Sequence, residues 1–220
     1  MKQIALDGPA GAGKSTIAKR IAETLHFVYI DTGAMYRTLA LACLKQGIDL
    51  TDEELVSEAA EQAELDIRYI DGVQHMILGE EDVSDEIRTE AVSKAASDTS
   101  KFQRVRCRLV SLQQKLAEKY NVVMDGRDIG TVVLPNADLK IFMTASVDVR
   151  AARRMKEYQE KGIACDLASI KEDISQRDYN DSHRANSPLK KAEDAIEIDT
   201  SDMSIEEVTQ AIADLYRKCE

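Results

Sequence analysis

The 220-residue sequence lacks the features of several protein classes. No apolar run approaches the length of a membrane-spanning helix, and the short stretch after Met1 leads straight into a glycine-rich segment, so we expect neither a membrane span nor a signal peptide. The four cysteines lie more than fifty positions apart, and neither they nor the three histidines have metal-ligand or triad spacing. These absences argue against a disulfide framework, a zinc site and a catalytic histidine, and they predict a cytoplasmic protein.

The sequence also lacks an excess of basic residues. Its formal net charge of −11 argues against general binding to nucleic acid or to an anionic membrane, since both need a basic face. Residues 49–66 hold eight acids and no lysine or arginine, which is typical of a solvated helix face. The arginines gather instead in local groups at 104–108, 150–154 and 177–184. Such local groups in an acidic protein predict a cleft that holds a small polyanion.

The distribution of apolar residues predicts an α/β fold. Amphipathic helical stretches separate most of five short apolar segments, which we interpret as strands at residues 3–6, 27–30, 121–124, 139–144 and 195–198. This alternation predicts a parallel five-stranded sheet covered by helices on both faces, with ligands at the carboxyl ends of the strands. The length suits one domain with a small insertion.

Three further segments carry local signals. Residues 65–70 and 73–78 flank Asp71-Gly72 and predict a hairpin, which residues 81–83 extend into a small antiparallel insert. Ser204 and Glu207 form a capping box that begins the last helix. The polar stretch 161–191 is either a lid over a phosphate site or a mobile surface loop.

A phosphate-binding motif follows the first predicted strand. Residues 8–15 match Gly-x4-Gly-Lys-[Ser/Thr], and a helical pattern begins at Thr16. Glycines let backbone N–H groups face a phosphate, Lys14 can reach the transferring phosphate, and the Ser15 hydroxyl can ligate Mg²⁺. The predicted ATP-binding residues are Gly8, Pro9, Ala10, Gly11, Ala12, Gly13, Lys14, Ser15 and Thr16.

The third predicted strand ends in Asp125, which as the partner of a phosphate loop is a candidate second ligand of Mg²⁺; its alternative role is that of a turn residue. Arg127 follows two positions later and is a candidate clamp for an acceptor phosphate, unless it only pairs with Asp128. Arg150, Arg153 and Arg154 form one stripe on a helix that begins near Ser146. The stripe is either solvated surface or a set of arms that close over the triphosphate.

Longer motifs resemble those of bacterial cytidylate kinases, a nucleoside monophosphate kinase family of P-loop proteins. The resemblance covers almost the whole chain and rests on residues 8–15, 30–37, 80–88, 125–133 and 177–184. It implies an adenylate-kinase-like chain with a core at 1–36, 90–150 and 190–220, a monophosphate-binding insert at about 37–89 and a lid at about 151–189. It also implies transfer of the ATP γ-phosphate to CMP or dCMP, with Mg²⁺.

The resemblance implies roles for individual residues. Lys14, Arg127, Arg153 and Arg184 would be catalytic, and Ser15 and Asp125 would hold the metal. The implied CMP site comprises Thr32, Arg37, Arg127 and Arg184 with Ser97, Arg106 and Asp128 at cytosine and Arg177 and Asp181 at the sugar. Where the family often has Asp or Arg, this chain has Tyr179, Asn180, Ser182 and His183, which puts the charge of the lid in question.

Two other functions fit parts of the sequence. One is another small-molecule P-loop kinase acting on UMP, AMP or a hydroxyl group. The other is a nucleotide-dependent switch, against which the sequence has no Asn-Lys-x-Asp motif for guanine. We expect a monomer whose partners are ATP and CMP or dCMP, without nucleic acid or membrane.

Overall fold

The computed structural model describes residues 1–219, and the chain divides into two compact units. The first unit comprises residues 1–27 and the chain from Asn121 onward, and the second comprises Val28–Tyr120. These boundaries follow packing. The predicted division into core, insert and lid follows substrate binding and not packing. The two units therefore do not test it, and it remains a prediction.

The first unit is built on parallel strands. They are β1 (Gln3–Asp7), β6 (Val122–Gly126), β7 (Leu139–Thr144) and β8 (Ile196–Asp199). With β2 (Val28–Asp31), the order of the sheet is β2-β6-β1-β7-β8, which confirms the predicted five-stranded parallel sheet. The strands of the sheet centre are apolar because both faces are covered: Ile4, Leu6 and Val123 are fully buried.

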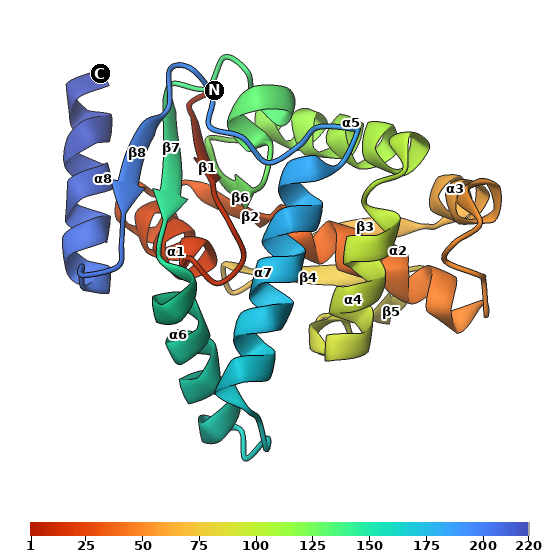
Figure 1. Ribbon diagram of the computed structural model, residues 1–220. Coiled ribbons are helices and arrows are strands. Elements are labelled where there is room, and N and C mark those ends of the chain that lie inside the picture. The colour runs from red at the N-terminus through yellow and green to blue at the C-terminus, as the bar shows by residue number, and fades with distance from the viewer. Residues whose placement is uncertain (220) are drawn as a thin grey trace. The chain divides into compact units, whose positions relative to one another are not determined.

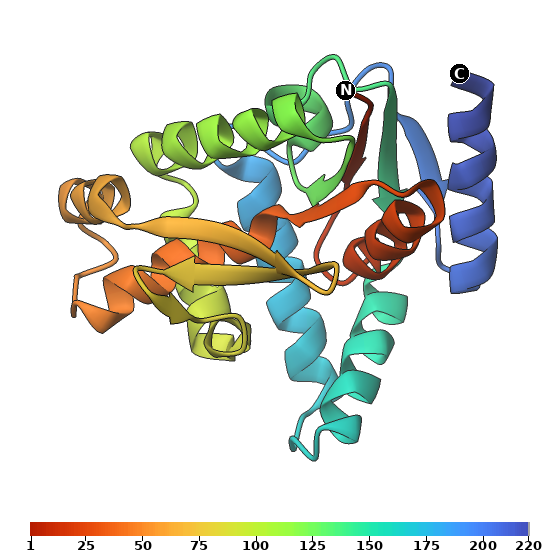
Figure 2. The ribbon, with the colours of Figure 1, turned by 180° about the vertical axis from the view of Figure 1, so that it is seen from behind.

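Helices α1 (Lys14–Leu25) and α8 (Ile205–Cys219) pack beside each other against these strands (Figures 1 and 2). The predicted capping box of α8 is confirmed. The Ser204 backbone N–H donates to Glu207 Oε2 at 2.8 Å, and the Glu207 backbone N–H donates to Ser204 Oγ at 3.2 Å.

Helices α6 (Val147–Glu160) and α7 (Leu167–His183) lie side by side as a hairpin after β7 (Figure 1). Helix α6 begins next to Ser146, as predicted, and the Ser146 hydroxyl caps it by accepting a hydrogen bond from the Val149 N–H at 3.2 Å. The prediction for 161–191 missed α7, and the alternative of a surface loop is wrong there. Ile170 and Ile174 lie one turn apart and are buried against Ala151. This apolar pattern is too short to predict a helix within a polar stretch. The predicted lid region therefore has a small core of its own.

The second unit contains the predicted hairpin. Strands β3 (Leu65–Ile70), β4 (Val73–Leu78) and β5 (Glu81–Asp82) form an antiparallel sheet in that order. Asp71 and Gly72 have φ values of 51° and 77°, as a tight two-residue turn requires. Helix α2 (Thr32–Lys45) packs on this sheet (Figure 2) and is followed by α3 (Glu53–Gln62), α4 (Glu90–Thr99) and α5 (Gln103–Lys119).

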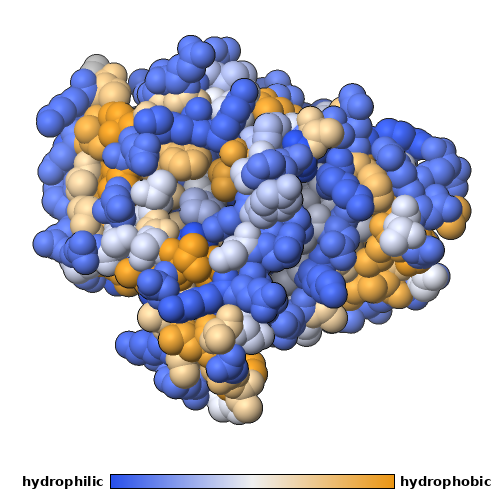
Figure 3. Space-filling view, viewed as in Figure 1, coloured by the Kyte–Doolittle hydropathy of each residue, from blue (hydrophilic) through white to orange (hydrophobic). Residues whose placement is uncertain are grey.

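The surface agrees with the composition. Hydrophilic residues cover most of the face in Figure 3, and among residues 1–219 no helix combines the length and apolarity that a membrane span needs. The acidic stretch of α3 is partly paired, since Arg104 of α5 contacts Glu54 at 2.7 Å and Glu61 at 2.9 Å. Arg108 donates to the Ala63 carbonyl at 2.7 Å. These two arginines therefore join α5 to the α3 segment.

Candidate active site

The phosphate loop, residues 8–15, connects β1 to α1 with a backbone that only glycine tolerates at key points. Gly8 has a φ of 148°, and a Cβ atom there would lie 2.1 Å from the Met143 carbonyl oxygen. Gly11 and Gly13 also have positive φ, at 75° and 87°. Within residues 1–219 no side chain caps the first turn of α1, so its N–H groups are suited to bind an anion.

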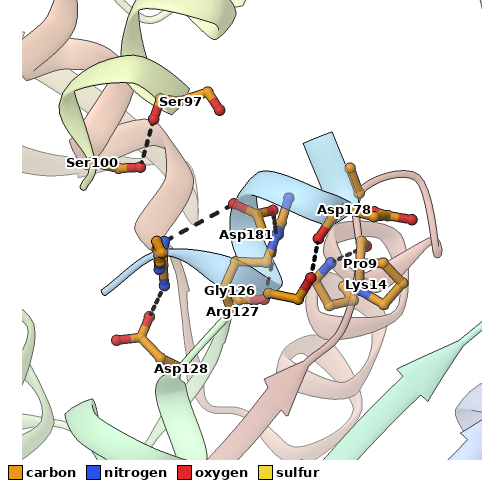
Figure 4. Close-up of polar contacts among 12 residues, drawn as sticks. Pro9, Lys14, Ser97, Ser100, Gly126, Arg127, Asp128, Asp178 and Asp181 are labelled. Carbon is orange, nitrogen blue, oxygen red and sulfur yellow. Dashed lines mark hydrogen bonds and ion pairs between the residues drawn. The ribbon is translucent and has the colours of Figure 1, made fainter. Parts of the chain in front are cut away.

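One donor from the loop itself and two from elsewhere hold the carbonyl groups of this loop. Lys14 Nζ donates to the Pro9 oxygen at 2.7 Å, as Figure 4 shows, and Arg150 Nη1 donates to the Ala10 oxygen at 3.0 Å. Thr200 Oγ1 donates to the Ala12 oxygen at 3.4 Å. Because these carbonyls point to protein donors, the loop is fixed with its N–H groups left for a ligand.

The ammonium group of Lys14 is buried in this loop, with 5% of the residue exposed. Burial lowers the pKa of Lys14 well below its usual range, and the positive charge of Arg127 lowers it further. Asp125 and Asp7 act in the opposite direction. A bound phosphate group would compensate the same charge, so the site is suited to an anion beside Lys14.

Two oxygen ligands of the kind that Mg²⁺ prefers lie next to the loop. Ser15 Oγ donates to Asp125 Oδ2 at 2.8 Å, and Asp125 is buried at the end of β6. Among the described residues no group of three or more His, Cys, Asp or Glu side chains could hold a metal. A hydroxyl and a carboxylate fit Mg²⁺, which usually keeps several waters and takes further oxygens from substrate phosphates.

A carboxylate that the sequence reasoning missed fixes the segment after β6. Asp7, at the end of β1, accepts hydrogen bonds from the backbone N–H groups of Ile129 and Gly130, both at 2.7 Å. Burial raises the pKa of Asp7 to about 6, even though these two N–H groups lower it. Asp7 therefore holds the one-turn π-helix Ile129–Val133, which follows Arg127 and Asp128 directly.

Four charged side chains in the first unit form what we call the arginine–carboxylate cluster: Arg127, Asp128, Asp181 and Arg184. Arg127 Nε contacts Asp181 Oδ2 at 2.8 Å, and Arg184 Nη2 contacts Asp128 Oδ1 at 3.4 Å (Figure 4). Arg184 also approaches Asp181, at 4.0 Å. The predicted alternative, a pair between Arg127 and its neighbour Asp128, is not the one that forms.

Opposite charges set the protonation of this cluster. Burial is the largest influence on the pKa of Arg127 and would lower it, but the carboxylates of Asp181, Asp125 and Asp178 together raise it above its usual value. Burial would likewise raise the pKa of Asp181, but Arg127, Arg177 and Arg184 together lower it. Both groups are charged at neutral pH. Arg177 therefore lies close enough to influence Asp181, in the same unit.

Arg153 lies beside the phosphate loop, where a Cβ atom added to Gly13 would be 4.0 Å from Arg153 Nη1. Its Nη2 donates to the Thr200 carbonyl at 2.6 Å. The structure thus places the Arg153 guanidinium near the loop but bound to the segment after β8.

The second unit holds the remaining predicted residues in two places. At the start of α2, Asp31 accepts from the Ala34 N–H at 2.9 Å and from Arg37 Nη2 at 3.0 Å, and Thr32 is buried. A Cβ atom added to Gly33 would lie 2.9 Å from Arg37 Nη1, so the Arg37 guanidinium packs against the backbone of this helix start. Arg37 is therefore fixed beside the N-terminus of α2.

The other place joins α4 and α5 through Ser100. Arg106, which is 4% exposed, donates from Nη1 to the Ser100 carbonyl at 3.2 Å, and Ser100 Oγ donates to the Ser97 carbonyl at 3.0 Å. The Arg106 guanidinium lies over the Tyr36 ring, 5.5 Å from its centre. The predicted cytosine-reading pair Ser97 and Arg106 thus shares one local network (Figure 4 shows the two serines).

The comparisons with known proteins agree with each other. The family model described as "Cytidylate kinase" matches residues 4–218. A protein named cytidylate kinase from Bacillus thuringiensis is 52% identical over 95% of this chain and 93% of its own length. Proteins of the same name from Leuconostoc mesenteroides and Lactobacillus johnsonii are 50% and 48% identical, over 97% and 99% of this chain and 95% of their own lengths.

Solved structures with low sequence identity have the same fold. An uncharacterized protein from Eubacterium ventriosum is 15% identical, with a TM-score of 0.54 and coverage of 99% of both chains. A gluconokinase from Sinorhizobium meliloti is 14% identical, with a TM-score of 0.51 and coverage of 99% of this chain and 92% of its own. At such identity the likeness extends to the fold alone.

Proposed function

Because the chain belongs to the cytidylate kinase family, it is an ATP-dependent kinase of CMP and dCMP, and we propose which of its side chains serve each substrate. The observation that carries the assignment is that one unit contains both a rigid phosphate loop and a buried cluster of arginines held by carboxylates. The first suits a triphosphate, and the second suits a smaller anion that can replace the carboxylates.

The donor ATP binds at the phosphate loop. Its phosphates accept hydrogen bonds from the loop N–H groups and the start of α1, and Lys14 moves from the Pro9 carbonyl to a phosphate oxygen. Ser15 and Asp125 would hold Mg²⁺, which would neutralise charge on the transferring phosphate. Arg153 is close enough to the loop to add a further positive charge there.

The phosphate of CMP is assigned to Arg127 and Arg184, and the family resemblance assigns Arg37 to it as well. In the structure each of these arginines is held by a carboxylate: Asp181, Asp128 and Asp31 respectively. A phosphate accepts the same forked hydrogen bonds as a carboxylate, so the substrate can exchange with these partners without leaving a buried guanidinium unpaired.

The rest of the nucleotide uses the freed carboxylates and the α4–α5 network. Asp128, Arg106 and Ser97 read cytosine, and Arg177 and Asp181 contact the sugar. Cytosine offers an amino donor at N4 and acceptors at N3 and O2, and uracil reverses the pattern at N4 and N3. A carboxylate at N4 therefore favours CMP, because UMP would place two acceptors against each other.

The reaction needs no nucleophile from the protein. An oxygen of the CMP phosphate forms a bond to the γ-phosphorus, the bond from that phosphorus to the bridging oxygen of ATP breaks, and ADP leaves with that electron pair. Arginine and lysine side chains balance the negative charge on the transferring group and hold donor and acceptor in line.

The remaining proposals concern motion, assembly and location. Helices α6 and α7 would move as a lid, since they share a small core of their own. We also propose a cytoplasmic monomer. The net charge of −11 argues against a nucleic-acid partner. Light scattering of the purified protein should give a mass near 24.5 kDa.

The test of this function is an assay of ADP formation from ATP and Mg²⁺ with CMP, dCMP, UMP, AMP and no acceptor. We expect turnover with CMP and dCMP that exceeds turnover with UMP and AMP. Faster turnover with UMP, AMP or a hydroxyl acceptor would favour the other kinase, and GTP hydrolysis that needs no acceptor would favour the switch.

A further inference from the structure

Arg150 is the most deeply buried arginine side chain for which the proposed mechanism gives no role. It belongs to α6 and is 4% exposed, and each of the three nitrogens of its guanidinium group has a partner. Nε donates to the Ala145 carbonyl at 2.8 Å, Nη1 to the Ala10 carbonyl at 3.0 Å, and Nη2 contacts Asp178 at 2.7 Å. One side chain thus joins the β7–α6 connection, the phosphate loop and helix α7.

The contact with the phosphate loop is close and specific. A Cβ atom added to Gly11 would lie 3.4 Å from the Arg150 Cβ, so the loop passes directly over the stem of this side chain. The hydrogen bond to Ala10 holds a peptide group in the middle of the loop. Any movement of the Arg150 guanidinium would therefore shift the N–H groups that face the ATP phosphates.

The contact with α7 links the same guanidinium to the acceptor side. Asp178 and Asp181 are three residues apart and so lie on one face of α7. Asp178 contacts Arg150. Asp181 contacts Arg127 of the arginine–carboxylate cluster (Figure 4). If the phosphate of CMP replaces Asp181 as the partner of Arg127, this face of α7 loses one of its two arginine partners.

The carboxylate of Asp178 is poorly satisfied in this state. One oxygen contacts Arg150, whereas the other, Oδ1, is buried without a hydrogen-bond partner among the described residues. A buried acceptor without a donor is unfavourable, so the position of α7 seen here is not the best one for Asp178. The release of Arg127 by Asp181 would therefore leave Asp178 as the remaining carboxylate on this face that holds α7 to an arginine.

We propose that Arg150 is a positioning residue that couples the ATP site to the CMP site, through its simultaneous contacts with the phosphate loop and with Asp178 of α7. This inference rests on the proposed function, since it takes CMP as the ligand that displaces Asp181 from Arg127. Arg150 itself touches neither substrate. Its effect is on how strongly one nucleotide changes the affinity for the other.

The test is calorimetric titration of a nonhydrolysable ATP analogue into the protein with and without saturating CMP. For the unmodified chain we expect the two dissociation constants to differ by about fivefold or more, the lower end of usual couplings between sites. Arg150→Lys keeps the charge but loses the fork, and Asp178→Asn keeps the shape but loses the charge, so each should reduce this factor to below about twofold.

Arg154→Lys is the matched control, because Arg154 lies on the same helix and its guanidinium stacks over Tyr158 instead, 5.7 Å from the ring centre. It should leave the factor unchanged. If Arg150→Lys fails to fold, Asp178→Asn decides, since that change removes one charge and places an amide where the acceptor has no partner.

The outcomes separate the two proposals. If the unmodified chain binds CMP but Arg150→Lys and Asp178→Asn keep its full factor, the coupling role is wrong and the proposed function stands. The same holds if the unmodified chain binds both nucleotides with no effect of one on the other. If CMP does not bind at all, both proposals fall.

Discussion

The phosphate loop and the arginine–carboxylate cluster, the two anion sites proposed above, are held in place by different means. The loop is fixed by its backbone: Gly8 leaves no room for a Cβ atom, and side chains from elsewhere hold its carbonyls. The cluster is fixed by its own charges, since each arginine is held by a carboxylate. The loop is thus ready for a ligand before it arrives, whereas the cluster must exchange partners.

This difference matters for specificity. A backbone loop recognises any phosphate of the right geometry, so it can serve the ATP that many kinases share. A cluster that gives up its internal ion pairs does so only for a ligand that replaces them. In the proposed exchange, the released carboxylates would become available to read the rest of the nucleotide.

The largest expected effect is that of Lys14→Ala. It removes the one charged side chain of the phosphate loop, so kcat should fall by about 10³-fold, the upper end for loss of one group that stabilises transferring charge. The free energy of unfolding should fall by no more than about 1 kcal/mol, because the burial of the Lys14 charge is itself unfavourable and its removal offsets the lost contacts. Lys19→Ala, on the exposed face of α1, is the control. Unchanged kcat in Lys14→Ala would exclude the proposed role.

Arg127→Ala tests the other side of the comparison. The change removes one phosphate clamp and leaves Asp181 without its closest partner, so we expect kcat/KM for CMP to fall by about 100-fold. The KM for ATP should change much less, which steady-state kinetics with each substrate varied will show. An equal loss for ATP would mean that the two regions are not distinct.

Asp128→Ala should affect selectivity more than rate. Without the carboxylate at N4, the preference for CMP over UMP, as a ratio of kcat/KM values, should narrow by about tenfold. Asp66→Ala, an exposed carboxylate on β3, serves as the control for loss of charge. A ratio that does not change would show that other groups read the base.

The smallest effect is a pH dependence that comes from Asp7. Its pKa in the folded state is raised to about 6 from 3.8, so the folded protein binds the proton more tightly than the unfolded chain does. The stability that this proton contributes is present below pH 4 and is lost as the pH rises through 6. Between pH 5 and 7 the stability of the unmodified chain relative to Asp7→Asn should fall by about 1 kcal/mol.

Urea unfolding of both proteins at several pH values measures this difference. Asp7→Asn keeps the shape of the side chain and has no titrating group, so effects of all other groups cancel in the comparison. A difference in stability that is constant from pH 5 to 7 would mean that Asp7 titrates normally and that its two N–H partners outweigh its burial.

The sequence predicted the features that depend on local pattern. The strands lie within one or two residues of their predicted ranges, and the hairpin around Asp71 and Gly72 is confirmed. The helix start near Ser146 and the capping box at Ser204 are confirmed as well. Each of these depends on residues close together in the chain. The phosphate loop belongs to the same class, because strand, glycines and helix follow one another.

The features that were missed depend on residues far apart in the chain. Asp7 holds residues 129 and 130, and Arg150 holds Ala10 across 140 positions. A lone Asp at the end of a strand and one Arg in a basic stripe give no local signal of such contacts. Helix α7 was not predicted for a related reason. Its buried face consists of few apolar residues and of carboxylates that pair with distant arginines.

The central claim is that the arginine–carboxylate cluster recognises the phosphate of CMP. Its most direct test compares the dissociation constants of CMP and of cytidine, which lacks the phosphate, for the unmodified chain and for Arg127→Ala. The account predicts that the unmodified chain binds CMP about 100-fold more tightly than cytidine and that Arg127→Ala loses most of this preference. Equal binding of CMP and cytidine by the unmodified chain, or a preference that survives in Arg127→Ala, would contradict it.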